Sequence, residues 1–208
     1  MASVNSPDPM SAPGAGEVTS AKIVIAGGFG VGKTTLVSTI SEIAPINTEA
    51  WMTAASEPVD PLDPGIDKRT TTVAMDFGRR TIADDLVLYL FGTPGQARFW
   101  PMWDDLCRGA IGALVLVDTH RLDSSFAAIN YFEQDSNVPF VVAVNLFNGQ
   151  QTHHLEDVRQ ALALSPDVPL TACDARDPAA VARALITVID HTMTHADVRT
   201  GAGSMAAL

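Results

Sequence analysis

The sequence predicts a doubly wound α/β domain with a mostly parallel sheet. Short β-branched stretches alternate with segments of helical periodicity, and two apolar runs are continuous enough to be strands buried on both faces. A chain of 208 residues with 47% hydrophobic content can bury one good-sized core. Because ligands bind at the carboxyl ends of the strands in such a sheet, we expect the functional residues in the loops that follow the strands.

The N-terminal part of the chain predicts a leader followed by a strand and a helix. Residues 1–20 are rich in Pro, Ser, Gly and Ala and lack apolar periodicity, which predicts a disordered leader. The domain is expected over residues 21–193, with a first strand over 22–26 and a helix up to Ile40. Residues 44–70 contain four prolines, so they predict a long functional loop without regular elements.

The rest of the chain predicts a hairpin and further βα units. Residues 71–77 and 85–91 resemble two strands, and Gly78-Arg79-Arg80 between them predicts a turn. The apolar runs 111–117 and 139–144 are the buried strands. Helices are expected over 121–132, 154–164 and 178–191, and residues 194–208 are expected to form a flexible tail.

Composition argues against several classes of function. The net charge is -11 and no cluster of Lys or Arg is present, which disfavours nucleic-acid binding and a polybasic membrane anchor. No apolar run is long enough to span a bilayer, and no signal peptide is visible. Cys107 and Cys173 are the only cysteines, as suits a reducing compartment. We therefore expect a cytoplasmic protein.

One loop of the chain predicts phosphate binding. It matches G-x-x-x-x-G-K-[ST] between an expected strand and an expected helix. Glycines let backbone N–H groups turn inward, the helix N-terminus attracts anions, the lysine supplies a point charge, and the threonine hydroxyl can ligate Mg²⁺. A glycine-rich turn without a ligand is the alternative, which the full pattern disfavours. The loop comprises Gly27, Gly28, Phe29, Gly30, Val31, Gly32, Lys33 and Thr34.

Three further segments follow expected strands. Phe91-Gly92-Thr93-Pro94-Gly95-Gln96 could place a backbone N–H on a γ-phosphate and a glutamine beside the attacking water. Residues 144–148, Val-Asn-Leu-Phe-Asn, and residues 171–175, Thr-Ala-Cys-Asp-Ala, follow two other strands.

With these motifs, residues 21–193 resemble the Ras-like small GTPases. More narrowly they resemble the bacterial MglA-type branch, including the conservon-associated GTPases of actinomycetes, where Thr-Pro-Gly-Gln also occurs. The resemblance implies a P-loop fold with a six-stranded sheet and five helices. It also implies binding of GTP and GDP with Mg²⁺, hydrolysis, and a change of partners on hydrolysis. A roadblock-domain regulatory protein and a signalling effector are the implied partners.

The resemblance also implies roles for single residues. Lys33 and Gln96 would be catalytic, with Gln96 positioning water and a solvated loop glutamine as the alternative. Thr35 would contact the α-phosphate and Gly95 the γ-phosphate. Thr72, with Thr70 and Thr71 as close rivals, would join Thr34 as a ligand of Mg²⁺.

Gly92 departs from the family pattern, because most small GTPases have there an aspartate that holds a Mg²⁺-bound water. Asp76 is the candidate replacement, and an exposed strand residue is the equally weighted alternative. Asp118 also ends an apolar run, and we interpret it as a strand-end cap.

The base-recognition loop departs further. The family reads guanine with Asn-Lys-x-Asp, whose carboxylate accepts two charge-assisted hydrogen bonds. Here the segment is Asn145-Leu146-Phe147-Asn148, so guanine preference is expected to be weaker, and Cys173-Asp174 matches the last base loop only loosely. Losing a bond to a charged group costs about 1.5–3 kcal/mol, or roughly ten- to a hundredfold in affinity.

Two more features admit two interpretations each. Arg69 could act as an internal arginine finger, or Lys68-Arg69 could be a solvated charge pair. The aromatic segment containing Phe99, Trp100, Met102 and Trp103 could be core or a partner-binding surface.

Three functions follow as hypotheses. The leading one is a GTP-dependent switch with slow hydrolysis. The others are a nucleotide-binding interaction module with little turnover and an ATP-using P-loop ATPase or kinase.

Overall fold

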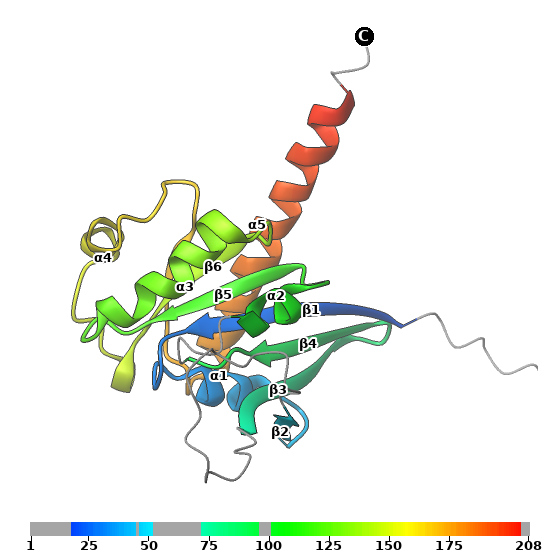
Figure 1. Cartoon of the computed structure of the whole chain (residues 1–208), viewed down its shortest axis with the longest axis horizontal. Helices are drawn as coiled ribbons and strands as arrows, with labels where there is room; N and C mark the ends of the chain where they lie inside the picture. The colour runs from blue at the N-terminus through cyan, green and yellow to red at the C-terminus, as the bar shows by residue number, and fades with distance from the viewer. Residues whose placement is uncertain (1–17, 45, 52–71, 96–100, 205–208) are drawn as a thin grey trace, which may run out of the picture.

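A seven-stranded sheet forms the centre of the structure (Figure 1). The structure is a computed structural model that describes residues 18–44, 46–51, 72–95 and 101–204. The strand order is β2-β3-β4-β1-β5-β6-β7, in which β2 and β3 run antiparallel to their neighbours and the other neighbours pair in parallel. The strands are β1 (Thr19–Gly27), β2 (Ile46–Trp51), β3 (Thr72–Ala83), β4 (Leu86–Gly92), β5 (Gly112–Val117), β6 (Phe140–Asn145) and β7 (Leu170–Cys173).

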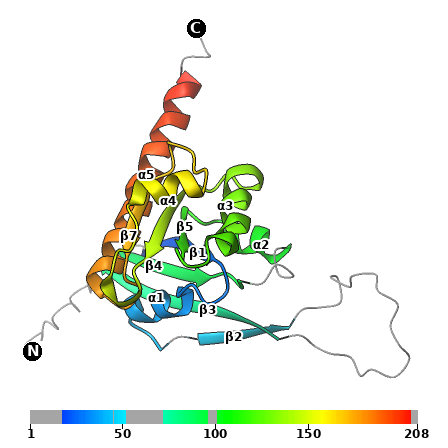
Figure 2. The same cartoon turned by 90° about the vertical axis from the view of Figure 1, so that its left-hand side faces the viewer.

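Helices cover both faces of this sheet. One face packs against α1 and α5, and the other against α2, α3 and α4. In both views α5, coloured orange to red, continues beyond the sheet toward the C-terminus (Figures 1 and 2). The helices are α1 (Lys33–Ile40), α2 (Trp103–Cys107), α3 (Phe126–Asn130), α4 (Leu155–Ala161) and α5 (Pro178–Ser204), with the short turns η3 (Leu122–Ser125), η4 (Tyr131–Asp135) and η5 (Phe147–Gly149).

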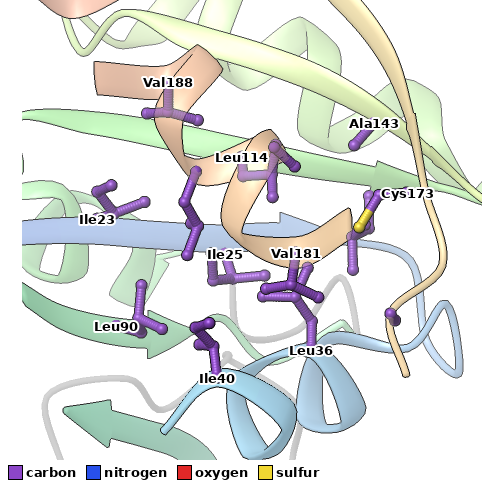
Figure 3. Close-up of a cluster of buried hydrophobic side chains, with 14 of the residues drawn as sticks. Ile23, Ile25, Leu36, Ile40, Leu90, Leu114, Ala143, Cys173, Val181 and Val188 are labelled. Atoms are coloured by element: carbon purple, nitrogen blue, oxygen red, sulfur yellow. The ribbon is translucent and has the colours of Figure 1, made fainter. Parts of the chain in front are cut away.

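The core forms two layers because successive strand residues point to opposite faces of the sheet. In β1, Ile23 and Ile25 join the cluster under α1 and α5, whereas Val24 and Ala26 join the other cluster. Figure 3 shows Val181 of α5 in the first cluster. A fully buried Ile or Leu side chain contributes about 1.5–3 kcal/mol relative to an exposed one, so this packing fixes the end of β1 and the start of α1.

The predicted fold class is confirmed, and three local expectations are corrected. The helix expected over 178–191 continues as α5 to Ser204, through most of the segment expected to form a flexible tail. Gly78-Arg79-Arg80 is not a turn, because β3 continues to Ala83. A Cβ on Gly78 would lie 2.7 Å from Val37 Cγ1, so close packing of α1 on the strand accounts for this glycine. The segment expected to lack regular elements contains strand β2, which pairs with β3 and adds a seventh strand at the sheet edge.

Two further observations concern the described residues. No helix among them combines the length and apolarity that crossing a membrane requires. Cys107 and Cys173 are both buried and free.

Candidate functional site

The phosphate loop follows β1 and leads directly into α1 (Figure 1). Gly32, the residue before α1, has φ 108°. Because glycine has no side chain to cap the helix, the first N–H groups of α1 remain available to a ligand. Gly27 has φ 134°, and a Cβ there would lie 2.4 Å from the Leu116 carbonyl oxygen. The loop therefore requires glycine at both positions, and its uncapped N–H groups form an anion site.

Lys33 lies inside this loop. Its side chain is 7% exposed, and Nζ donates to the carbonyl oxygens of Gly27 at 2.9 Å and Gly28 at 2.7 Å. Burial lowers the pKa of Lys33 to about 8, and the negative charge of Asp76 acts in the opposite direction. The ammonium is thus held over the loop, where a phosphate group would supply a stronger partner than two carbonyls.

Thr34 and Asp76 meet beside the loop. Thr34 Oγ1 donates to Asp76 Oδ2 at 2.8 Å. Asp76 lies directly opposite Gly92 in the β3–β4 pair, and a Cβ on Gly92 would lie 2.9 Å from Asp76 Oδ2. The carboxylate therefore occupies the space above Gly92, which supports Asp76 as the replacement for an aspartate at position 92.

The donor chemistry at this point fits a hard cation. Among the described residues no group of three or more His, Cys, Asp or Glu could hold a metal ion by itself. A hydroxyl and a carboxylate 2.8 Å apart fit Mg²⁺, which binds proteins through one or two oxygens and takes its remaining ligands from water and phosphate.

Gly95 brings the loop after β4 against the phosphate loop. A Cβ on Gly95 would lie 2.8 Å from the Phe29 backbone nitrogen and 2.9 Å from Lys33 Nζ. Thr93, two residues earlier, is tied to β1 by its N–H, which donates to the Ile25 carbonyl at 2.8 Å. Backbone groups near Gly95 are therefore within reach of an anion bound at Lys33.

Asn145 connects three loops. Its Nδ2 donates to the Val31 carbonyl at 2.8 Å, and its Oδ1 accepts from the Ala175 N–H at 3.1 Å. The side chain is only 6% exposed. The phosphate loop and the loop after β7 thus have a fixed relative position.

Asn148 lies on the adjoining exposed loop with φ 61°. Its Oδ1 accepts from Arg176 Nη1 at 3.1 Å, while Arg176 Nε and Nη2 donate to the two oxygens of Asp174 at 3.1 and 3.0 Å. These hydrogen bonds hold the pKa of Asp174 below its ordinary value, so its carboxylate is ionised. The Arg176 guanidinium therefore links the carboxylate of Asp174 to the amide of Asn148.

Leu146 and Cys173 are placed mainly by packing. Leu146 packs against the core cluster under α3 and α4, and its N–H donates to the Cys173 carbonyl at 2.9 Å. Burial raises the pKa of the Cys173 thiol to about 11, and this side chain belongs to the core. A contact of Cys173 with a base would therefore involve the backbone.

Some predicted site residues lie outside the described part of the chain. These are Gln96, Arg69, Thr70, Thr71, Phe99 and Trp100. Thr72 begins β3 opposite Trp51, and Thr35 is exposed on α1. Of the aromatic segment, Trp103 is 2% exposed and contacts Tyr131 edge to face, so it belongs to the core.

Sequence reasoning missed two arginines. Arg176 stands two residues after Asp174, and Arg121 follows β5 by four residues. The available signal was their position, because each is a charged residue just beyond a strand whose carboxyl end faces the phosphate loop.

The chain is similar to two known proteins. An uncharacterized protein of Methanocaldococcus jannaschii is 27% identical over 125 residues, which cover 60% of this chain and 68% of that protein. The crystal structure of the cytosolic domain of the T. maritima FeoB iron transporter in apo form has a TM-score of 0.58 at 14% identity. That alignment covers 84% of this chain and spans 64% of the FeoB chain, and it supports the fold alone.

A family profile covers most of the chain. The family described as conserved hypothetical ATP binding protein matches residues 25–195, a range that includes the whole phosphate loop, Asp76, Asn145 and Asp174. The chain has a P-loop NTPase fold with a nucleotide-binding loop, and it belongs to this family of conserved hypothetical ATP binding proteins.

Proposed function

We propose that the chain is a Mg²⁺-dependent switch that binds guanine nucleotides and slowly hydrolyses GTP to GDP and phosphate. One observation carries this proposal: Lys33, the Thr34–Asp76 pair and Gly95 meet around one glycine-rich loop at the N-terminus of α1. This arrangement combines an anion cradle, a buried cation and hard oxygen ligands, which together suit a Mg²⁺-nucleotide.

Each residue would have a distinct task. Backbone N–H groups of the loop and Lys33 would hold the phosphates, and Thr35 would contact the α-phosphate. Thr34 would ligate Mg²⁺, with Thr72 as the second threonine ligand and Asp76 holding a water of the metal shell. Mg²⁺ supplies charge neutralisation at the phosphates when it is bound.

Hydrolysis would depend on the loop after β4. Gly95 would donate its backbone N–H to the γ-phosphate, and Gln96 would orient the attacking water. Loss of the γ-phosphate would remove the proposed partner of Gly95 and the triphosphate state in which Thr72 closes on Mg²⁺, so the segments that carry these two residues would be released together. The resemblance to MglA-type proteins adds a roadblock-domain protein and a signalling effector as proposed partners.

The guanine assignment depends on acceptors near the base. Asp174 is an ionised carboxylate whose oxygens are oriented by Arg176, and Asn145 is fixed beside it. Carboxylate oxygens accept hydrogen bonds from N1–H and the 2-amino group of guanine, which adenine lacks. We infer that Asp174 takes over part of the recognition that a carboxylate at position 148 would give.

ATP is the second candidate substrate, and a specific observation favours it. The family description names ATP. In addition, the oxygen of the Asn148 amide accepts from Arg176, so its NH₂ group can donate a hydrogen bond to an acceptor on the base. A binding module with little turnover is the remaining alternative, because Asn148 and Gly92 both depart from the hydrolysing pattern.

The first experiment identifies the nucleotide released when freshly purified full-length protein is denatured. Titrations with GTP, GDP and ATP, with and without Mg²⁺, then give affinities, and Lys33→Ala serves as the variant that loses the phosphate partner. We expect tighter binding of GTP than ATP and dependence on Mg²⁺. Absence of saturable binding would refute the proposal, and tighter binding of ATP would assign the second candidate. Multiple-turnover phosphate release that is lost in Gln96→Leu separates an enzyme from a binding module.

A further inference from the structure

Arg121 places a second cation against the phosphate loop. It follows β5 at the same edge of the sheet as the loop, and its Nη2 and Nη1 lie 3.4 and 3.8 Å from the position of a Cβ on Gly30. Apart from Gly30 and its two chain neighbours, no other described heavy atom lies within 4 Å of that position. The guanidinium therefore covers the Gly30 face of the loop.

Asp118 holds the arginine in this orientation. It is 5% exposed, its Oδ2 accepts from Arg121 Nε at 3.1 Å, and its Oδ1 accepts from the His120 N–H at 2.9 Å. Burial alone would raise the pKa of Asp118, but the hydrogen bonds from His120 and Arg121 hold it below its ordinary value. The ionised, buried carboxylate of Asp118 thus fixes Nε of the Arg121 guanidinium by a hydrogen bond.

Among the described residues, no acceptor takes the N–H groups of the terminal nitrogens of Arg121, Nη1 and Nη2. The ion pair with Asp118 uses Nε instead. Arg121 also borders a cavity of about 300 Å³ that reaches Gly27, Phe29 and Gly95. A planar group with free donors beside an anion cradle matches the geometry that arginine uses for phosphate.

We propose that Arg121 is a nucleotide-binding residue, which donates from its terminal nitrogens to the phosphate chain opposite Lys33. The inference rests on the proposed nucleotide-binding function and adds to it the source of a second positive charge. Lys33 is held inside the loop by two carbonyls, whereas Arg121 approaches from the loop after β5. The phosphates would thus be held by cations from two separate parts of the sheet edge.

The test compares Arg121→Ala, Arg121→Lys and Arg108→Ala in the full-length chain. Arg108 is a matched control, because its side chain is 81% exposed and pairs with Asp105 at the opposite end of β5. Affinities for GDP and GTP with Mg²⁺ are measured by calorimetry at low and high KCl. Thermal melting without nucleotide reports stability separately.

We expect Arg121→Ala to weaken both nucleotides by about ten- to a hundredfold and to reduce the salt dependence of binding. Arg121→Lys should recover part of the affinity, because it restores the charge without the planar fork. Arg108→Ala should bind like the wild type.

Two results would overturn the inference. The first is an Arg121→Ala variant that binds nucleotide with wild-type affinity. If its melting temperature nevertheless falls, the arginine stabilises the loop and does not bind the nucleotide. A wild-type chain that binds neither GDP, GTP nor ATP would refute the proposed function, and the inference with it.

Discussion

Asp76 lies directly opposite Gly92 across the β3–β4 pair, and its carboxylate fills the space that a side chain on Gly92 would occupy. The same carboxylate accepts a hydrogen bond from Thr34 at the start of α1. The register of β3 against β4 therefore places Asp76 over Gly92 and within hydrogen-bond distance of Thr34, the candidate metal ligand on the phosphate loop.

The first prediction tests this complementarity with Gly92→Ala. A methyl group would lie 2.8 Å from Asp76 Cβ and 2.9 Å from its Oδ2, so Asp76 must shift, which disturbs its hydrogen bond with Thr34. We expect the Mg²⁺-dependent part of nucleotide affinity to fall, while binding without Mg²⁺ changes little. Calorimetry with and without Mg²⁺ measures both. Equal affinity of the variant and wild type in Mg²⁺ would show that Asp76 need not occupy this position.

The second prediction removes the charge of Asp76. Asp76→Asn keeps the size of the side chain and an acceptor for Thr34, but it removes the negative charge that a Mg²⁺ shell requires. Substitution of such outer-shell groups typically costs about ten- to a hundredfold in metal affinity. We therefore expect the Mg²⁺ concentration for half-maximal GTP binding to rise by about that factor. Asp85→Asn, on the exposed turn of the same hairpin, is the control. A Mg²⁺ titration of Asp76→Asn that overlays the wild type would contradict the prediction.

The third prediction concerns Gly95. Its substitution by alanine would bring a methyl group within 2.8 Å of the Phe29 backbone nitrogen and 2.9 Å of the Gly28 carbonyl carbon. Backbone atoms of the phosphate loop yield less readily than a flexible side chain, so the loop after β4 must retreat. We expect Gly95→Ala to bind GDP nearly normally, to bind GTP more weakly and to release phosphate more slowly. The ratio of GTP to GDP affinity measures the effect within one variant, and an unchanged ratio would show that Gly95 does not contact the γ-phosphate.

The fourth prediction concerns stability. Asn145→Ala leaves the Val31 carbonyl and the Ala175 N–H without their buried partner. Each unsatisfied buried group costs about 1–3 kcal/mol, so we expect the loss of two partners to destabilise nucleotide-free protein by roughly 2–6 kcal/mol. Urea unfolding measures this value. Asn130→Ala, on the exposed surface of α3, should change stability little. A loss below about 1 kcal/mol for Asn145→Ala would indicate that water replaces the amide.

How far the sequence predicts the fold depends on whether the signal is local. Alternating apolar strands and helices predicted the fold class, because that pattern repeats along the chain. Strand β2 was not predicted, because its pairing with β3 is a long-range contact made by a proline-containing segment. Gly78 was assigned to a turn, whereas the contact that requires glycine comes from α1.

The site divides in the same way. The phosphate loop was predicted because its residues are contiguous, and the structure places Lys33 and Thr34 together there. Asp76 could be proposed only as a candidate, since its position over Gly92 depends on strand register. Arg121 was not identified, because its proximity to Gly30 arises from a contact between two loops that follow different strands.

The fifth prediction tests base recognition at Asn148. Its amide oxygen accepts from Arg176 Nη1, and the neighbouring carboxylate of Asp174 accepts from the same guanidinium. Asn148→Asp would keep the acceptor for Arg176, strengthen that bond with a charge, and leave a second carboxylate oxygen for the guanine N–H groups.

We expect Asn148→Asp to raise the affinity for GTP over ATP by roughly ten- to a hundredfold, the factor that corresponds to one charge-assisted hydrogen bond. Competition between GTP and ATP for a fluorescent GDP analogue measures the ratio. Asn130→Asp is the control, because it adds the same charge on an exposed part of α3. A ratio that does not change in Asn148→Asp would place the base out of reach of this side chain. The preference that remains would then be assigned to Asp174, with Asp174→Asn as the deciding variant.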